Sequence, residues 1–411
     1  MLYVDYSIGF GGAIKSLGLT LGKLAGVEPL LLTTQKPDLV ERWLPQCRVW
    51  YFRRWVNYRS IAAVIEWADR HVRLRGVRWA VRKLIAVINV GTAIKNTAWL
   101  LWLLRREQVD LVHLNNGFVP AEALLATRIS KVPCIVHLRE FASAPLNDRL
   151  APVDHVSRVI AVSDAVAKGL ADLGFDPERI TTIHDPVDID RVTRSACDRA
   201  RIRAHLGISD EDLAIGIFGR VVRWKGQHIF VEAAIAAMRA NPRVRAVIVG
   251  DESDGQKRYF DGIRQMIAES GLADRFILTG YVTDVEAYYH AMDIVVHASI
   301  EPEPFGMVVP EAMTAGRAVI AVKVGGPAEV ISDGLTGILV RPGDCGALTK
   351  AMELLLHDSP RRADIGSSAA HEARYRFSLT KNAAAVAAVY KTLFPQFRPD
   401  NPLFYDSGFS R

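Results

Sequence analysis

The stretch over residues 293–328 reads DIVVHASIEPEPFGMVVPEAMTAGRAVIAVKVGGPA. It opens with an apolar run, residues 294–298, which predicts a buried strand. Residues 307–313 then change to helical spacing, which Gly316 ends, and a second apolar run follows at residues 318–322. The predicted order is therefore strand, loop, helix, strand, which is the repeating unit of a parallel α/β sheet.

The loop and the helix start in this stretch have the character of an anion site. A proline fits the first helical turn, so we expect the backbone N–H groups of Phe305, Gly306 and Met307 to point out of the helix N-terminus. Glu303 and Glu311 bracket the loop, and carboxylates beside a bound phosphate suit sugar or ribose hydroxyls. The alternative is that Glu311 complements the helix dipole and Glu303 is a solvated loop charge.

The arrangement E-P-F-G-x-x-x-x-E-A-M-x-x-G resembles the signature of the family 4 retaining glycosyltransferases. The resemblance implies the GT-B fold, an α/β architecture in which two Rossmann-like, doubly wound domains face a central cleft. It also implies a nucleotide-sugar donor. On this resemblance Glu303 is a catalytic residue, and the donor is bound by Phe305, Gly306, Met307 and Glu311.

Composition indicates a two-domain globular chain of 411 residues, half of them apolar. The four cysteines, at positions 47, 134, 197 and 345, share no close spacing, which favours a reducing cytoplasmic compartment over a disulfide framework or a zinc site. The longest stretches without a charged residue, such as residues 84–94, reach only eleven residues. We therefore expect no membrane-spanning helix, and the N-terminal sequence predicts no signal peptide.

Positive charge is concentrated in residues 51–106, where twelve Lys and Arg face two acidic residues, although the whole chain carries only +6. Five tryptophans, at positions 55, 67, 79, 99 and 102, are interleaved with these cations. A basic, aromatic, helical stretch of this kind predicts peripheral binding to an anionic surface, here the inner face of the plasma membrane. Nucleic-acid binding and ordinary amphipathic helices with a solvated basic face are the alternatives.

Strand-like runs alternate with helical segments along the chain, which predicts a parallel, doubly wound sheet in each half. The predicted strands are residues 2–6, 29–33, 110–114, 134–138, 158–162, 180–183, 213–218, 246–249, 276–278, 294–298 and 318–322. We assign residues 1–190 to an N-terminal acceptor domain, 191–385 to a C-terminal donor domain, and 386–411 to a segment that crosses back to the N-terminal domain.

Two features of the N-terminal half are candidate site elements. Gly11 and Gly12 follow the first strand and resemble the family's glycine loop, which closes against the donor diphosphate; Ile14 replaces the third glycine of a dinucleotide fingerprint, so NAD binding is not expected. His137 ends a predicted strand, where ligands gather in such folds. In the family, a histidine at this place contacts the sugar. His113 also ends a predicted strand and is the alternative candidate for this contact.

In the C-terminal half, Gly219 and Arg220 directly follow a predicted strand and Lys225 opens the next helix. Arg offers a bidentate fork and Lys a point charge, which together suit a diphosphate. This element resembles the family's G-R-x-x-x-x-K-G segment, which neutralises the leaving group. Gly250 and Val282 end later strands and resemble the segments that line the family's base pocket.

The resemblance implies a retaining glycosyltransferase and favours a UDP-sugar as the donor. From this resemblance and the residues described above, we expect a metal-independent enzyme that moves a sugar to a glycan or lipid-linked acceptor in cell-envelope or exopolysaccharide biosynthesis. No cofactor and no nucleic-acid partner are expected. Two Asp-x-Asp pairs, at residues 188–190 and 210–212, are interpreted as solvated rather than metal-binding. A nucleotide-sugar epimerase of the same fold, or a membrane-surface binding protein with an inactive donor site, are the alternatives.

Overall fold

The computed structural model describes residues 1–6, 11–52, 75–143, 153–253, 255–395 and 397. The chain forms two compact units: unit 1 takes residues 1–161, 167–181 and those from 386 onward, and unit 2 takes residues 162–166 and 182–385. Residues 182–190, which the sequence assigned to the N-terminal domain, thus belong to unit 2. The reason is local hydrogen bonding: Val187 N donates to Phe377 O at 2.9 Å, and Asn382 Nδ2 donates to His184 O at 2.8 Å.

Unit 1 contains a parallel sheet in the order β3-β2-β1-β4-β5-β6-β7. The strands are β1 (Leu2–Asp5), β2 (Leu30–Thr33), β3 (Arg48–Tyr51), β4 (Val112–Leu114), β5 (Cys134–Leu138), β6 (Arg158–Ala161) and β7 (Ile180–Thr182). The helices are α1 (Gly12–Leu21), α2 (Pro37–Trp43), α4 (Arg75–Arg106), α5 (Ala121–Ser130) and α6 (Asp164–Asp172). The strand order reverses beside β1, the place where doubly wound folds bind ligands at the carboxyl ends of the strands.

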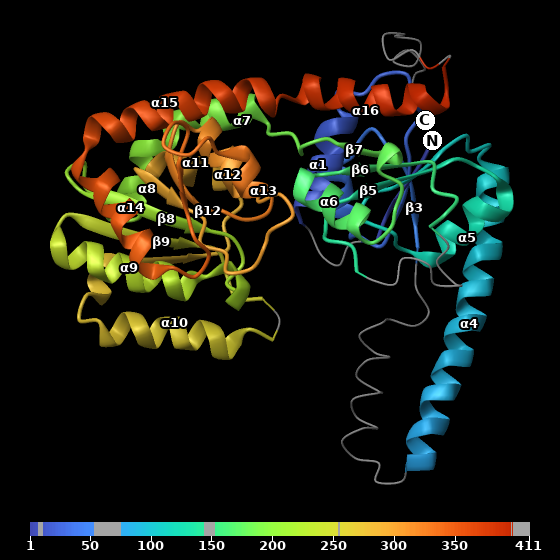
Figure 1. Cartoon of the computed structure of the whole chain (residues 1–411), viewed down its shortest axis with the longest axis horizontal. Coiled ribbons are helices and arrows are strands. Elements are labelled where there is room, and N and C mark those ends of the chain that lie inside the picture. The colour runs from blue at the N-terminus through green and yellow to red at the C-terminus, as the bar shows by residue number, and fades with distance from the viewer. Residues whose placement is uncertain (7–10, 53–74, 144–152, 254, 396, 398–411) are drawn as a thin grey trace. The chain divides into compact units, whose positions relative to one another are not determined.

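Unit 2 contains a second parallel sheet in the order β10-β9-β8-β11-β12-β13 (Figure 1). The strands are β8 (Leu213–Phe218), β9 (Val244–Val249), β10 (Phe276–Gly280), β11 (Ile294–Val296), β12 (Ala318–Val322) and β13 (Ile338–Val340). The helices are α7 (Ile189–Arg194), α8 (Arg199–His205), α9 (Gln227–Ala240), α10 (Lys257–Glu269), α11 (Val285–Ala291), α12 (Val308–Thr314), α13 (Gly326–Val330), α14 (Cys345–His357) and α15 (Ser359–Arg376). Helix α16 (Leu379–Leu393) begins in unit 2, and its residues from 386 onward belong to unit 1. The predicted α/β class with two doubly wound domains is confirmed.

The central strands form because their sequences are apolar without interruption. Every residue of β1, β2, β5 and β12 is buried, as expected of parallel strands that are covered by helices on both faces. The edge strand β3 was not predicted from the sequence, because its sequence RVWY begins with a charged residue and its residues are exposed or half-buried.

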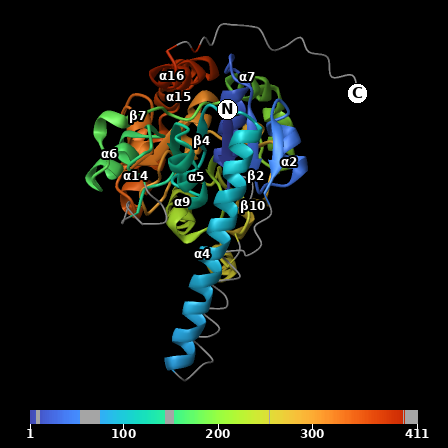
Figure 2. The same cartoon turned by 90° about the vertical axis from the view of Figure 1, so that its right-hand side faces the viewer.

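Helix α4 contains the described part of the basic, aromatic region. Its C-terminal part packs on α5, where Asn96 Nδ2 donates to Glu122 Oε1 at 3.1 Å and Leu100, Leu103 and Leu104 are buried. Its N-terminal part extends away from the sheet of unit 1 in both views (Figures 1 and 2). The other predicted members of this region, Arg53, Arg54, Trp55, Arg59, Trp67, Arg70 and Arg73, lie outside the described residues.

One helix among the described residues is long and apolar enough to cross a membrane by these two criteria, over Val77–Arg106. This differs from the expectation drawn from charge-free stretches alone. The difference arises because the averaged hydropathy tolerates the scattered cations of α4, whereas the search for a charge-free stretch ends at each of them.

Candidate active site

The turn from β8 into α9 carries the two predicted cations. Gly219 and Arg220 follow the last residue of β8, and the Arg220 side chain is exposed. Lys225 ends a short 3-10 turn and is followed by Gly226, which has φ +73°. A Cβ added at Gly226 would lie 1.9 Å from the backbone oxygen of Ala298, so only glycine lets this turn pack against the loop that follows β11.

This packing joins Lys225 to Glu303. Lys225 Nζ donates to Glu303 Oε1 at 2.5 Å, although the two residues are 78 positions apart. The second carboxylate oxygen, Oε2, accepts from His297 Nε2 at 2.6 Å and from Ser299 Oγ at 3.1 Å. Both oxygens of Glu303 are thus held by fixed donors, and the residue is only 9% exposed. The interpretation of Glu303 as a solvated loop charge is therefore wrong.

The surroundings of Glu303 keep it ionised. Burial by itself raises the pKa of the Glu303 carboxyl, but the nearby Lys225 ammonium and the hydrogen-bonded His297 more than offset this and hold the pKa well below its usual range. Because a carboxylate only accepts, His297 Nε2 must carry a hydrogen. The site therefore contains a permanent negative charge beside a permanent positive charge.

His297 and Ser299 were missed as site residues in the sequence. Residues 294–298 were read as one strand, but β11 ends at Val296, so His297 and Ser299 leave the sheet at its carboxyl end. Their position in the sequence could have identified them. Both polar side chains come directly after a buried strand, six and four residues before Glu303. This is the place where α/β sheets bind ligands.

Glu311 lies inside α12 and is 7% exposed. Its Oε2 accepts from Tyr289 Oη of α11 at 2.8 Å. The Tyr289 ring contacts the Phe218 ring at the end of β8, with 4.3 Å between centroids. Burial and the neighbouring Glu311 raise the pKa of Tyr289 well above its usual value, so the phenol remains a hydrogen donor. Glu311 is thus tied to the same end of the sheet as Gly219 and Arg220.

The remaining predicted donor residues lie on loops of unit 2. Gly250 follows β9, and a Cβ there would lie 2.0 Å from Gly219 O, so glycine is required for these two loops to touch. Val282 is half-buried in the loop after β10. Phe305 is buried beside His184, with 5.4 Å between the ring centroids. Because its side chain is buried, Phe305 would contact a ligand through its backbone.

Helix α12 begins at Val308, later than the predicted start near Phe305. Gly306 and Met307 therefore belong to the entry of the helix, where Val309 N donates to Gly306 O at 2.9 Å. Met307 is the N-cap residue and is half-buried.

In unit 1, His137 lies near the end of β5 and is 3% exposed. Burial and the Arg139 guanidinium hold the pKa of His137 well below its usual value, so the ring is neutral at pH 7. Arg139 Nη2 contacts His137 Nδ1 at 3.2 Å. Because a guanidinium only donates, Nδ1 is the acceptor and the ring hydrogen is on Nε2. Within the described parts of the chain this buried Nε2 has no hydrogen-bond partner.

The rival histidine, His113, takes part in a buried chain of hydroxyl groups. Its Nδ1 lies 2.7 Å from Tyr390 Oη of α16, which is 3.1 Å from Tyr3 Oη of β1. Burial, with a smaller effect of Arg139, lowers the pKa of His113 to about 3. This arrangement fastens the end of α16 to the sheet of unit 1, which is a structural role.

The glycine loop of unit 1 precedes α1. Gly11 is the N-cap of α1 and Gly12 its first residue, and both are exposed. Arg139 connects this helix to the strand ends, because Nη1 donates to Ser16 Oγ at 3.0 Å and Nε to Asn115 O at 3.1 Å.

The Asp-x-Asp pairs have structural explanations. Asp188 caps α7 by accepting from Arg191 N at 3.0 Å. Asp212, interpreted as solvated, is in fact buried and pairs with Arg245 at 3.2 Å. Over the described ranges no group of three or more His, Cys, Asp or Glu side chains could hold a metal ion.

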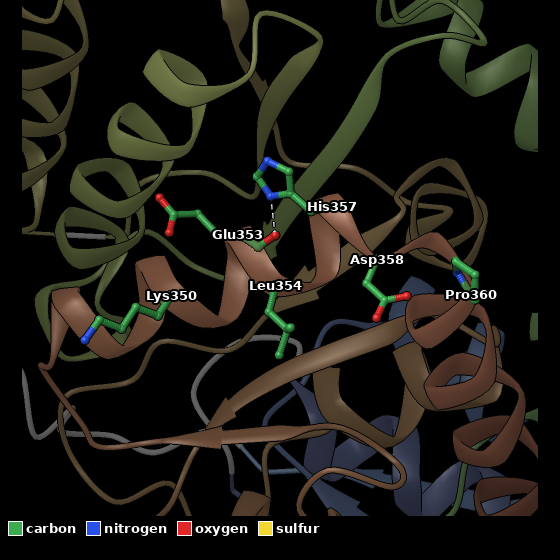
Figure 3. Close-up of a pocket in the computed structure, with 6 residues that line it drawn as sticks. All are labelled: Lys350, Glu353, Leu354, His357, Asp358 and Pro360. Carbon is green, nitrogen blue, oxygen red and sulfur yellow. Dashed lines mark hydrogen bonds between the residues drawn. The ribbon is translucent and has the colours of Figure 1, made fainter.

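A surface hollow at the junction of α14 and α15 contains none of the predicted site residues (Figure 3). Its polar groups complete helix ends: His357 Nδ1 lies 2.7 Å from Glu353 O, and Asp358 Oδ1 accepts from Arg361 N at 2.9 Å. We assign it no function.

Two family models match consecutive parts of the chain. The model described as Glycosyltransferase Family 4 matches residues 25–191, and the model described as Glycosyl transferases group 1 matches residues 198–372. The second match includes the cations and both glutamates of the site described above.

Curated relatives carry the same kind of domain. The chain is 30% identical over 198 residues to the lipopolysaccharide core biosynthesis mannosyltransferase LpsB of Rhizobium meliloti, covering 48% of this chain and 56% of the relative. It is 33% identical over 254 residues to D-inositol 3-phosphate glycosyltransferase 2 of Catenulispora acidiphila, covering 60% and 58%. The chain thus spans little more than half the length of these relatives.

Solved structures match over nearly the whole chain. Anabaena Alr3699/HepE in complex with UDP superposes with a TM-score of 0.74 at 25% identity, covering 95% of this chain and 99% of that one. A glycosyltransferase from Rickettsia africae gives a TM-score of 0.76 at 20% identity, covering 96% and 98%, which shows the fold alone.

Proposed function

Because the chain belongs to glycosyltransferase family 4, we propose that it transfers a sugar from a nucleoside diphosphate sugar to a glycan or lipid-linked acceptor with retention of configuration. A UDP-sugar is the favoured donor, since the similar Anabaena protein was solved with UDP and with UDP-glucose. The name of the Rhizobium relative supports an acceptor from cell-envelope biosynthesis.

The observation that carries this proposal is the buried cluster formed by Lys225, Glu303 and His297 after the ends of β8 and β11. Cleavage of a sugar–diphosphate bond builds negative charge on the leaving phosphate and positive charge at the anomeric carbon. Fixed charges of both signs at one place stabilise both changes without reorganisation of solvent.

Each residue then has a distinct role. Arg220 and Lys225 neutralise the departing diphosphate, and Glu303 stabilises the developing charge on the sugar. Glu311 binds the ribose hydroxyls. Gly219, Gly250 and Val282 border the nucleotide.

Of the two histidines in unit 1, we assign the sugar contact to His137. Its Nε2 carries a hydrogen and has no partner among the described residues, whereas His113 is engaged with Tyr390. A neutral imidazole N–H suits a sugar hydroxyl. Gly11 and Gly12 are proposed to meet the diphosphate.

The proposal is tested by a thermal-shift panel of nucleotide sugars with the full chain. A donor at about 100 times its dissociation constant stabilises the folded state by about 2.7 kcal/mol, which raises the melting temperature. Arg220→Met should abolish this shift, and Arg243→Met, also an exposed arginine of unit 2, should keep it. A panel with no stabilising nucleotide sugar would contradict the proposal, and donor conversion to an altered sugar without any acceptor would indicate an epimerase.

We also expect donor cleavage without a divalent cation, because Arg220 and Lys225 provide the positive charge that a metal ion supplies in other transferases. Full turnover should persist in EDTA, measured as release of the nucleoside diphosphate. Complete loss of turnover in EDTA, with recovery on adding manganese, would disprove this role of the two cations.

A further inference from the structure

The exposed N-terminal part of α4 is not used by the proposed reaction. Up to residue 95 many of its apolar side chains are open to solvent, whereas from Asn96 onward the helix is packed on α5. The most exposed side chains include Trp79 at 64%, Leu84 at 61% and Ile94 at 65%. An exposed apolar face of this extent marks an interaction surface.

Helical geometry places these side chains in two stripes. Residues 77, 84 and 88 form one stripe along the helix, and residues 79, 83, 90 and 94 form a second one. At 3.6 residues per turn the two stripes lie about 130° apart around the axis. The exposed residues Ala80 and Gly91 lie between them, so the two stripes together span about half of the helix surface. We call the α4 apolar face the set Val77, Trp79, Leu84, Ile88, Val90 and Ile94, all of which are exposed.

Charge on the helix is of one sign. Up to residue 95, the sequence of α4 contains five Lys and Arg and no Asp or Glu. The other two cations, Arg105 and Arg106, lie in the packed part, where Arg106 pairs with Glu107 at 3.6 Å. Lys83 lies within the second stripe, with Nζ 5.7 Å from the centroid of the Trp79 ring. Apolar residues and an amphipathic aromatic ring beside cations are the features of a helix that lies in the headgroup region of a membrane.

We propose that the α4 apolar face docks on a membrane surface carrying anionic lipid headgroups. The aliphatic and aromatic side chains enter the boundary between headgroups and acyl chains, and the cations of α4 attract the anionic lipids.

The helix lies on the membrane instead of crossing it. Its charge-free stretch, residues 84–94, is eleven residues long, which corresponds to about 16 Å of helix against about 30 Å of hydrocarbon. From Asn96 onward one side of the helix packs on unit 1, where Leu100, Leu103 and Leu104 are buried, so this part is not a free helix that could cross a bilayer.

Other occupants of this face are less compatible with it. The phosphates of a nucleic acid would pair with the cations, but they would leave the aliphatic side chains of Leu84, Ile88 and Ile94 exposed. A second copy of the chain, related by two-fold symmetry, would bring two helices of the same positive charge together. Only anionic lipid matches both the charge and the apolar surface.

The test is co-sedimentation of the full chain with vesicles of phosphatidylcholine alone or mixed with phosphatidylglycerol. Binding should be confined largely to the mixed vesicles and should weaken at high salt, because the Debye length falls from about 10 Å at 0.1 M to about 3 Å at 1 M. Lys83→Gln should lower the partition coefficient about fivefold, from about 1 kcal/mol per cation near such a surface.

Leu84→Asp should lower the partition coefficient at least about tenfold, since it places a carboxylate against the anionic surface and removes apolar area. Leu335→Asp is the matched control, because Leu335 of unit 2 is 60% exposed, close to the exposure of Leu84. It should leave vesicle binding unchanged. Circular dichroism and an unchanged melting temperature show that both variants are folded.

Equal binding to neutral and anionic vesicles, binding to neither, or full binding by Leu84→Asp would overturn the proposal. Binding to a duplex oligonucleotide that survives Leu84→Asp would assign the cations to nucleic acid instead. A lipid-free dimer that Leu84→Asp converts to a monomer would assign the face to self-association.

Discussion

Glu303→Gln is expected to lower the turnover number about 10²- to 10³-fold, which corresponds to about 3 kcal/mol of transition-state stabilisation, by analogy with removal of one preorganised electrostatic group. The carboxylate is held by Lys225 and His297 and is ionised throughout the working pH range, so it can act on positive charge as that charge develops. The amide keeps the shape of the side chain but not its charge.

Glu311→Gln is the matched comparison, because Glu311 is also a buried glutamate of unit 2. A group that binds ribose equally in the ground and transition states should change the Michaelis constant for the donor and not the turnover number. Steady-state kinetics with a donor identified by thermal shift separates the two effects, with circular dichroism as the control for folding. Unchanged turnover in Glu303→Gln would remove this carboxylate from the chemical step.

Lys225→Met is expected to destabilise the protein by about 3–5 kcal/mol as well as to weaken donor cleavage, because it leaves the buried Glu303 carboxylate without its main cation. The side chains of Lys225 and Glu303 are only 13% and 12% exposed. Urea unfolding at pH 7 measures the effect. Lys168→Met is the control: Lys168 pairs with Asp172 at 2.7 Å, but these side chains are 74% and 62% exposed, so the loss should stay below about 1 kcal/mol.

The Lys225–Glu303 pair also makes the stability of the folded protein depend on pH. The pKa of Glu303 is lower in the folded than in the unfolded chain, so its contribution to stability is complete above the unfolded pKa of about 4.3 and is lost as the pH falls toward the folded value. Removing Lys225 raises the pKa of Glu303 and moves this loss to higher pH. In the double variant Lys225→Met, Glu303→Gln the two losses should not add, because the uncompensated charge is gone. Strict additivity would show that the two side chains do not interact in solution.

The sheets were predictable because buried parallel strands are continuous apolar runs. The observed bounds of β5, β8 and β12 match the predicted residues 134–138, 213–218 and 318–322. β3 and β13 were not predicted, since β3 contains an exposed arginine and β13 has only three residues. Both lie at sheet edges, where one side of the strand needs no partner and the sequence is less constrained.

Site residues were predictable only as positions along the chain. Strand ends and glycine turns identified Arg220, Lys225 and Glu303, because polar residues after buried strands gather at one edge of a parallel sheet. His297 was hidden because an imidazole is compatible with a strand interior, and β11 ends one residue before it.

By itself, the sequence determined the α/β class, the two doubly wound domains and the family, since these follow from hydrophobic period, from turn residues and from a motif contained in one short stretch. Only the tertiary structure decided that Lys225 and His297 hold opposite oxygens of Glu303, that His113 is engaged by Tyr390, and that α4 packs on α5 from residue 96 onward but not before it. The physical reason is distance along the chain: hydrogen-bond partners 78 or 277 residues apart are chosen by how the elements pack, and no local pattern records that choice.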